Sequence, residues 1–161
     1  RYTGREAWPL WDLVTVAQAF HWFPLGETLA EFARILKPGG SCAAFWNIRD
    51  RSTPVMRAYD ELLRRFSSEY AVLGKPEAAI AALKASPLVS APREAEFPSF
   101  QRLELEGFLG RVYSSSYVVH GVEDAQGFDR ELRSLFETHQ SGGAVEFAYR
   151  SAAVSFRPAP G

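Results

Sequence analysis

His21 and Trp22 are the adjacent side chains in this sequence with the clearest capacity for chemistry. They follow a short apolar run at residues 12–17, whose β-branched side chains predict a buried parallel strand. An imidazole titrates near neutral pH and can take or give a proton. An indole can stack on a planar ligand or face a cation. The pair predicts a binding site at the end of this strand, and a purely structural role in closing the sheet is the alternative.

The segment that follows predicts the rest of a βαβ unit. Residues 27–36 have helical spacing, and Lys37-Pro38-Gly39-Gly40 is typical of a helix end. Residues 41–46 then predict a second strand with small side chains. Because parallel strands joined by a crossover end at the same edge of a sheet, residues 18–22 and 47–50 are expected to share a crevice.

The remaining sequence predicts further helices and two more strands. Thr53-Pro54 is typical of a helix start, with Thr53 as its cap, and apolar spacing continues this helix to Tyr70 before a break at 74–76. Three prolines predict a loop over residues 86–98. The other expected elements are an alanine-rich helix at 77–85, a short strand around 94–97, helices at 105–113 and 128–139, and a last strand at 144–156. The apolar residues of the last strand change phase, which predicts a bulge or burial on both faces.

Composition bounds the class of protein. With 161 residues, 47% of them hydrophobic, the chain has the size of one folded domain, 1–161. Eighteen basic and nineteen acidic residues nearly cancel, so no field favours nucleic acid, and no apolar run reaches the roughly 20 residues that span a membrane. The single cysteine, Cys42, fits a cytoplasmic protein. His120 and His139 have no neighbours at ligand spacing, so no metal site is expected.

Five segments of the chain resemble a known family. They are DLVTVAQAFHW (12–22), EFARILKPGG (31–40), FWN (45–47), GRVYSSSY (110–117) and AVEFAYRSAAVSF (144–156). The chain resembles the C-terminal half of a class I S-adenosylmethionine-dependent methyltransferase of the type 11 group, from about Gly4 to Arg157. The first of these segments is the specific part of the resemblance.

The resemblance implies an α/β fold with a Rossmann-like sheet of seven strands, mostly parallel with an antiparallel last strand. Residues 12–17, 41–46 and 144–156 would be its fourth, fifth and last strands. The activity implied is methyl transfer to a small-molecule acceptor, with His21 as the catalytic base when the acceptor carries a proton, and otherwise as an orienting or packing residue. By position, S-adenosylmethionine would lie beside Glu6, Ala7, Ala17, Gln18, Ala19, His21 and Trp22, and the acceptor beside Trp22, Asn47, Tyr113, Tyr117 and Tyr149.

Several parts of that family's pattern are missing from these 161 residues. There is no glycine-rich loop after a first strand, no acidic residue after a second strand, and no counterpart of strands one to three. Because the chain starts at Arg1 and its only methionine is Met56, we expect a truncated product, with a removed initiator as the alternative. A sheet without those strands would expose an edge that favours self-association. The alternatives are therefore a non-enzymatic remnant or interaction module, and a half-enzyme completed by another chain.

Overall fold

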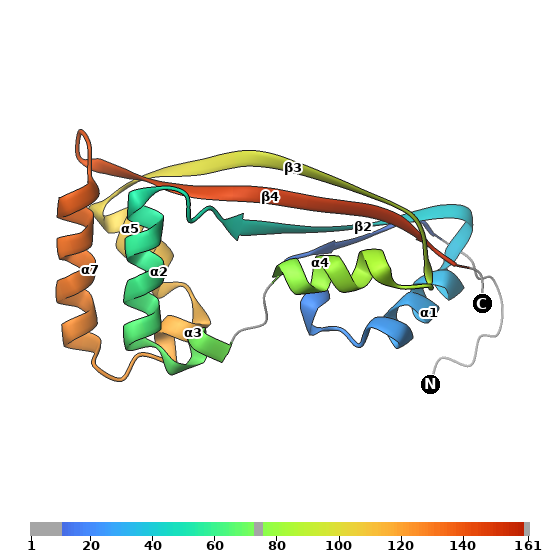
Figure 1. Ribbon diagram of the computed structural model, residues 1–161, viewed down its shortest axis with the longest axis horizontal. Coiled ribbons are helices and arrows are strands. Elements are labelled where there is room, and N and C mark those ends of the chain that lie inside the picture. Colours follow the sequence, from blue (N-terminus) through green and yellow to red (C-terminus); the bar gives the residue numbers. More distant parts are fainter. Residues whose placement is uncertain (1–10, 73–75, 160–161) are drawn as a thin grey trace. The chain divides into compact units, whose positions relative to one another are not determined.

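The computed structural model describes residues 11–72 and 76–159, which form two compact units (Figure 1). Among the described residues, unit 1 comprises 11–47, 76–97 and 151–159, and unit 2 comprises 48–72 and 98–150. The expectation of one domain over 1–161 stays a prediction. In the described part, no helix is long and apolar enough to cross a membrane.

The described helices and strands alternate along the chain, as an α/β protein requires. In chain order they are β1 (Trp11–Ala17), the 3-10 turn η1 (Phe20–Trp22), α1 (Leu25–Ile35), β2 (Leu36–Arg49), α2 (Pro54–Phe66), α3 (Ser68–Val72), α4 (Pro76–Ala85), β3 (Val89–Glu104), α5 (Leu105–Tyr113), α6 (Ser116–Val119), α7 (Ala125–His139) and β4 (Ala144–Pro158). The strands form a mixed sheet in the order β1-β2-β4-β3. The α/β class is confirmed, and the seven-stranded sheet of the family stays a prediction.

Strand pairing follows the expected βαβ topology. β1 is parallel to β2, with Leu13 opposite Ser41 and Ala17 opposite Phe45. β4 runs antiparallel to β2. Within unit 1 the Ser151 hydroxyl donates to the Asn47 side chain, and within unit 2 the Asp50 N–H donates to the Ala148 carbonyl. The residue numbers along β4 therefore fall as those along β2 rise, as in an antiparallel pair.

The crossover from β1 to β2 forms for the reasons the sequence indicates. α1 buries Leu29 and Phe32, and it ends where Pro38 forbids another turn. Gly39 has φ +83°, and a Cβ on Gly40 would lie 2.9 Å from the Lys37 carbonyl oxygen, so glycine is required at both positions. β2 begins at Leu36, earlier than predicted, because these turn residues already belong to the strand.

Two strands differ from the sequence expectation. β1 was expected to be buried, and this is wrong: only Val16 is buried along it, and Leu13 is 55% exposed. The reason is its place at the end of the strand order. Residues 86–98 were expected to be mainly a loop, whereas β3 extends over 16 residues. As β3 is the other outer strand of the order, Pro92 and Pro98 are tolerated although they lack an N–H.

The first helix of unit 2 starts as predicted and ends earlier. Pro54 is its first residue, but the Thr53 hydroxyl makes no capping bond and is buried without a partner. The helix ends at Phe66 instead of Tyr70. There the Ser67 hydroxyl donates to the Tyr117 carbonyl at 2.6 Å and accepts from the Tyr70 N–H at 3.1 Å, which replaces helical bonds and starts α3. The predicted break at 74–76 falls largely outside the described residues.

The phase change predicted for the last strand coincides with the boundary between the units. Within unit 2, Val145, Phe147 and Tyr149 are buried, and Phe147 packs against Tyr59 and Phe108. Within unit 1 the buried residues are Ala152, Val154 and Phe156. β4 therefore contributes one phase of side chains to each core.

Candidate functional site

The carboxyl end of β1 is shaped by a residue in a strained conformation. Gln18 has φ +55°, a region that side chains other than glycine rarely occupy, and its N–H donates to the Phe45 carbonyl at 2.9 Å. The Trp22 N–H then donates to the Ala19 carbonyl at 2.9 Å and closes η1. Such a conformation costs about 1–3 kcal/mol and is found mostly at functional turns. Here it directs the chain from β1 into the His21-Trp22 turn.

His21 accepts one side-chain hydrogen bond, and its partial burial favours the neutral imidazole. Its Nδ1 accepts a hydrogen bond of 3.4 Å from Trp46 Nε1, so the proton of the neutral ring lies on Nε2. Burial lowers the pKa of His21 below its ordinary value. At neutral pH the imidazole therefore offers an Nε2–H donor. Nδ1 can accept a proton only when it releases the Trp46 indole.

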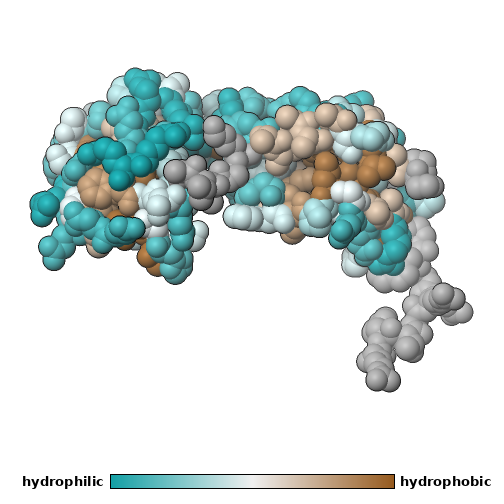
Figure 2. Space-filling view, turned by 60° about the horizontal axis from the view of Figure 1, so that its bottom comes forward, coloured by the Kyte–Doolittle hydropathy of each residue, from teal (hydrophilic) through white to brown (hydrophobic). Residues whose placement is uncertain are grey.

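The two aromatic residues Phe20 and Trp22 of this turn differ in burial. Phe20 is buried and lies edge-on to Trp46 and Phe156 at centroid distances of 6.4 and 6.2 Å. Trp22 is 67% exposed, with its ring 4.9 Å from that of His21. Phe20 thus anchors the turn in the core of unit 1, and Trp22 presents an open aromatic face. On the face drawn in Figure 2, apolar residues gather in a patch on unit 1.

The structure places the predicted residues of unit 1 at or near the carboxyl ends of β1 and β2. Ala17 ends β1, and the turn carrying Gln18, Ala19, His21 and Trp22 follows it directly. Asn47 lies two residues beyond Phe45, the partner of Ala17, and its Oδ1 accepts from the Ser151 hydroxyl at 2.8 Å. Glu6 and Ala7 lie outside the described residues.

The predicted tyrosines belong to unit 2 and do not form one group. The Tyr113 hydroxyl donates to the Asp129 carboxylate on α7 at 2.8 Å, and burial together with this bond raises the pKa of Tyr113 to about 12. Tyr117 and Tyr149 instead contact arginines. The Tyr149 hydroxyl accepts from Arg111 Nε at 2.9 Å. The structure therefore places Tyr113 against a carboxylate, Tyr117 against Arg49 and Tyr149 against Arg111.

Sequence reasoning placed Arg49 only in the crevice expected of residues 18–22 and 47–50, as part of a charged pair with Asp50, and did not predict its contacts with tyrosines. Its guanidinium lies 5.2–5.3 Å from the ring centres of Tyr59, Tyr70 and Tyr117, and Nη2 donates to the Tyr117 hydroxyl. Nη1 is buried and has no hydrogen-bond partner. Burial opposes the charge of Arg49, but the surrounding tyrosine hydroxyls outweigh it and raise the pKa. The available signal in the sequence was a charged residue directly after the buried Ile48.

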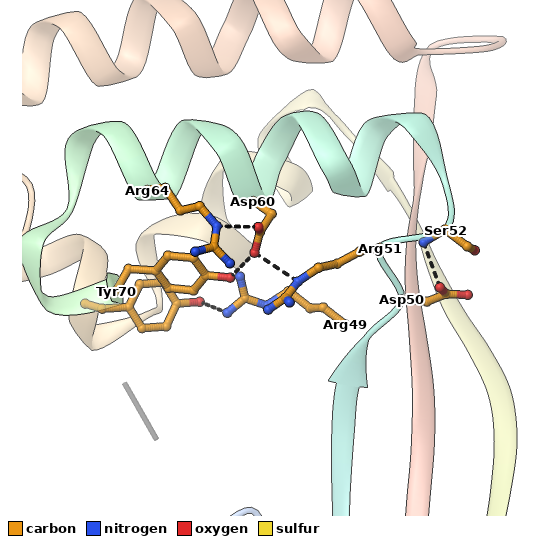
Figure 3. Close-up of polar contacts among 8 residues, drawn as sticks. Arg49, Asp50, Arg51, Ser52, Asp60, Arg64 and Tyr70 are labelled. Carbon is orange, nitrogen blue, oxygen red and sulfur yellow. Dashed lines mark hydrogen bonds and ion pairs between the residues drawn. The ribbon is translucent and has the colours of Figure 1, made fainter. Parts of the chain in front are cut away.

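Asp60 is the carboxylate nearest along α2 to this cluster, and it is already bound by other groups (Figure 3). It accepts from the Tyr70 hydroxyl at 2.5 Å and pairs with Arg51 Nε at 2.9 Å and Arg64 Nε at 2.7 Å. Burial would raise the pKa of Asp60, but the Tyr70 and arginine contacts outweigh it and lower the pKa. Asp60 is therefore shared by two guanidinium groups and one phenol.

Comparison with known proteins finds methyltransferases similar to the segment that contains β1, α1 and the start of β2. The family model for the methyltransferase domain matches residues 10–44. An uncharacterised methyltransferase of Schizosaccharomyces pombe is 48% identical over 54 residues, which are 34% of this chain and 22% of that protein. An uncharacterised methyltransferase of Mycobacterium tuberculosis is 41% identical over a segment of the same length, with the same coverage.

One solved structure extends the likeness to most of the fold. A candidate type II methyltransferase from Anaeromyxobacter dehalogenans superposes with a TM-score of 0.58 at 22% identity, covering 93% of this chain and 66% of that one. The resemblance to the class I S-adenosylmethionine-dependent methyltransferases is confirmed.

The family model for the methyltransferase domain covers only part of the predicted site. Residues 10–44 include Gln18, Ala19, His21 and Trp22, whereas Asn47 and the three tyrosines lie beyond them. The chain spans about a fifth of the length of the curated relatives it matches. In the described residues, no group of His, Cys, Asp and Glu side chains has the arrangement of a metal site.

Proposed function

We propose that the intact protein transfers a methyl group from S-adenosylmethionine to a small-molecule acceptor. In this proposal the present chain supplies the β1–α1–β2 end of the catalytic domain. The observation that carries the proposal is the strained turn at Gln18, which directs His21 and Trp22 from the end of β1 within a segment similar to methyltransferase domains. Cytoplasmic residence is part of the proposal and agrees with a single, reduced and buried Cys42.

The residues at this edge fit one end of the cofactor. S-adenosylmethionine supplies a methyl group on a positively charged sulfur. The open face of Trp22 can lie against such a cation, because an indole attracts positive charge through its quadrupole. The exposed Gln18 side chain adds a polar group beside it. Contacts to the ribose and adenine would come from parts of the intact protein other than these residues, since the chain has no glycine-rich loop.

His21 has two possible tasks, and its hydrogen bond separates them. With Nδ1 bonded to Trp46, the Nε2–H donates to an acceptor oxygen and fixes its orientation. Acting as a base would instead require Nδ1 to leave the indole and take the acceptor's proton. Positioning alone can supply several kcal/mol of barrier reduction in such a displacement. We therefore propose orientation of the acceptor as the first role of His21.

The exposed β1 edge carries the proposal about partners. β1 lies at the end of the strand order, and its Leu13 and Trp11 side chains are exposed. An edge strand with apolar side chains is a template for pairing. We propose that this edge pairs with further strands of the intact protein or, in the isolated chain, with a second copy.

Calorimetric titration of the full chain with S-adenosylhomocysteine tests the proposed function. We expect micromolar binding that Trp22→Ala weakens at least tenfold and His21→Ala weakens less. Phe100→Ala serves as the matched control, because Phe100 is an equally exposed aromatic residue of unit 2. Absence of heat at millimolar ligand, from a chain that circular dichroism shows to be folded, would contradict a cofactor half-site on this chain.

A further inference from the structure

We propose that unit 2 contains a carboxylate-binding site formed by Arg49 with Arg111 among tyrosine hydroxyls. Its role as the recognition site for a carboxylate on the methyl acceptor rests on the proposed function above. The site itself depends only on contacts within unit 2. The family model for the methyltransferase domain ends at residue 44, before these residues.

The first step of the argument is the missing counter-charge of Arg49. A guanidinium has five N–H donors and stays charged in any protein. Nη2 of Arg49 donates to the Tyr117 hydroxyl, but Nη1 is buried with less than 1 Å² exposed and has no partner. Among the described residues, no carboxylate forms an ion pair with Arg49. Buried charges are normally paired with an opposite charge, whereas the described contacts of Arg49 are with tyrosine rings and a hydroxyl.

The surrounding groups cannot provide that charge. The nearby Asp60 accepts from the Tyr70 hydroxyl and pairs with Arg51 and Arg64, as Figure 3 shows, so its charge is already shared by two other guanidinium groups. The described contacts of the cluster therefore include more guanidinium groups than carboxylates. An anion from outside the unit would balance this charge.

Arg111 provides a second cation in unit 2, bonded to Tyr149 rather than to the three tyrosines that surround Arg49. Its Nε donates to the Tyr149 hydroxyl and its Nη1 contacts the Ser115 hydroxyl at 3.4 Å, so it also lacks a carboxylate partner among the described residues. Burial raises the pKa of Tyr59, while Arg49 and Arg111 both act to lower it. Both guanidinium groups thus act on one buried phenol.

The shape of the cluster favours a carboxylate over other anions. The unpartnered edge of Arg49 lies among flat tyrosine rings, and the Tyr117 hydroxyl, which accepts from Arg49, can also donate. A planar, singly charged group fits one guanidinium edge and one hydroxyl. In this proposal the ligand enters past Tyr70 and Tyr117, which are only partly buried.

Titration of the full chain with benzoate tests the site, with benzamide as a neutral probe of the same shape. Binding is followed by calorimetry and by the side-chain ¹⁵N resonances of the arginines. We expect millimolar benzoate affinity, at least tenfold weaker binding of benzamide, and a shifted Arg49 resonance. Arg49→Met should weaken benzoate at least tenfold. Arg64→Met, which removes the same charge from the exposed side of the cluster, should change it less than twofold.

Three results would overturn the proposal. Equal affinity for benzoate and benzamide, equal effects of the two substitutions, or tighter binding of inorganic phosphate than of benzoate would each exclude a carboxylate site at Arg49. If Arg49→Met does not fold, two measurements replace it: the benzoate affinity of Arg49→Lys and the shift of the wild-type Arg49 resonance on addition of benzoate. Both report whether Arg49 binds the carboxylate. Failure of the proposed function is distinguishable, because S-adenosylhomocysteine binding would then be absent while benzoate still binds.

Discussion

Replacing Asp60 with asparagine should destabilise the chain by about 2–3 kcal/mol. The carboxylate is 13% exposed and accepts from the Tyr70 hydroxyl, while Arg51 and Arg64 are 47% and 52% exposed. A hydrogen bond to a charged group contributes about 1.5–3 kcal/mol. The two solvated ion pairs add about 0.5 kcal/mol each after screening. Asparagine keeps the shape and one acceptor oxygen but loses the charge, so most of this sum is lost.

The same substitution should change how stability depends on pH. The contacts of Asp60 hold its pKa below the ordinary range, despite the opposing effect of burial. A carboxyl group with a lowered pKa in the folded state stabilises the protein above its unfolded pKa, about 3.9, and loses that contribution as pH falls through the folded value. The difference between wild type and Asp60→Asn should therefore be constant from pH 5 to 7 and shrink below about pH 4.

Urea unfolding followed by circular dichroism measures both effects, and the chain provides a matched control. Asp129 also accepts from a tyrosine hydroxyl and pairs with an arginine four residues later, but it lies on the surface of α7. Asp129→Asn should cost less than about 1 kcal/mol, as exposed pairs do. Equal losses for the two variants would show that burial of Asp60 does not strengthen its contacts, and would refute the reasoning.

Four further predictions concern separate parts of the chain. Phe108→Ala should lower the free energy of unfolding by about 3–5 kcal/mol in urea titrations, because its side chain is fully buried. Burial raises the pKa of Cys42 to about 12, so a thiol reagent at pH 8 should modify it only after unfolding, and stability should fall as pH rises above about 8.5. NMR titration should give His21 a pKa below that of the unfolded chain, with its contribution to stability lost as pH falls through the unfolded pKa. Leu13→Lys should reduce self-association in sedimentation experiments, and unchanged association would exclude the β1 edge.

The elements that the sequence predicts well are those with local signals. The apolar run before His21, the helical spacing of α1 and the turn at Pro38 each depend on a few neighbouring residues, and together they define the crossover. The phase change in β4 is also local, because the buried positions alternate along one strand. Its cause, the contribution of this strand to two units, is not visible in the spacing.

Sequence reasoning failed where the outcome depends on position in the sheet. Burial of β1 was inferred from its composition, but exposure is set by which strands flank it. Pro92 and Pro98 indicated a loop, yet an outer strand can contain prolines at positions whose N–H is not needed. Both errors have the same cause. The sequence contains the residues of an edge strand but not the identity of its neighbours.

The candidate site divides in the same way. The location of His21 and Trp22 follows from the end of a strand, whereas the left-handed conformation of Gln18 has no sequence signal, since glutamine has no preference for it. Arg49 was read as a residue after a strand. Its burial depends on Tyr59, Tyr70 and Tyr117, which come from three different helices and meet only in the folded unit.

The two proposed sites have opposite charge preferences, which bears on what kind of acceptor fits. The Trp22 face suits a cation, and the Arg49 cluster suits an anion. A guanidinium that binds a carboxylate withdraws electron density from its oxygens and makes them poorer nucleophiles. A carboxylate held by Arg49 would therefore serve recognition, because its oxygens are the ones that the guanidinium makes less reactive. The Arg49 cluster thus favours ligands whose nucleophilic atom is not part of the bound carboxylate.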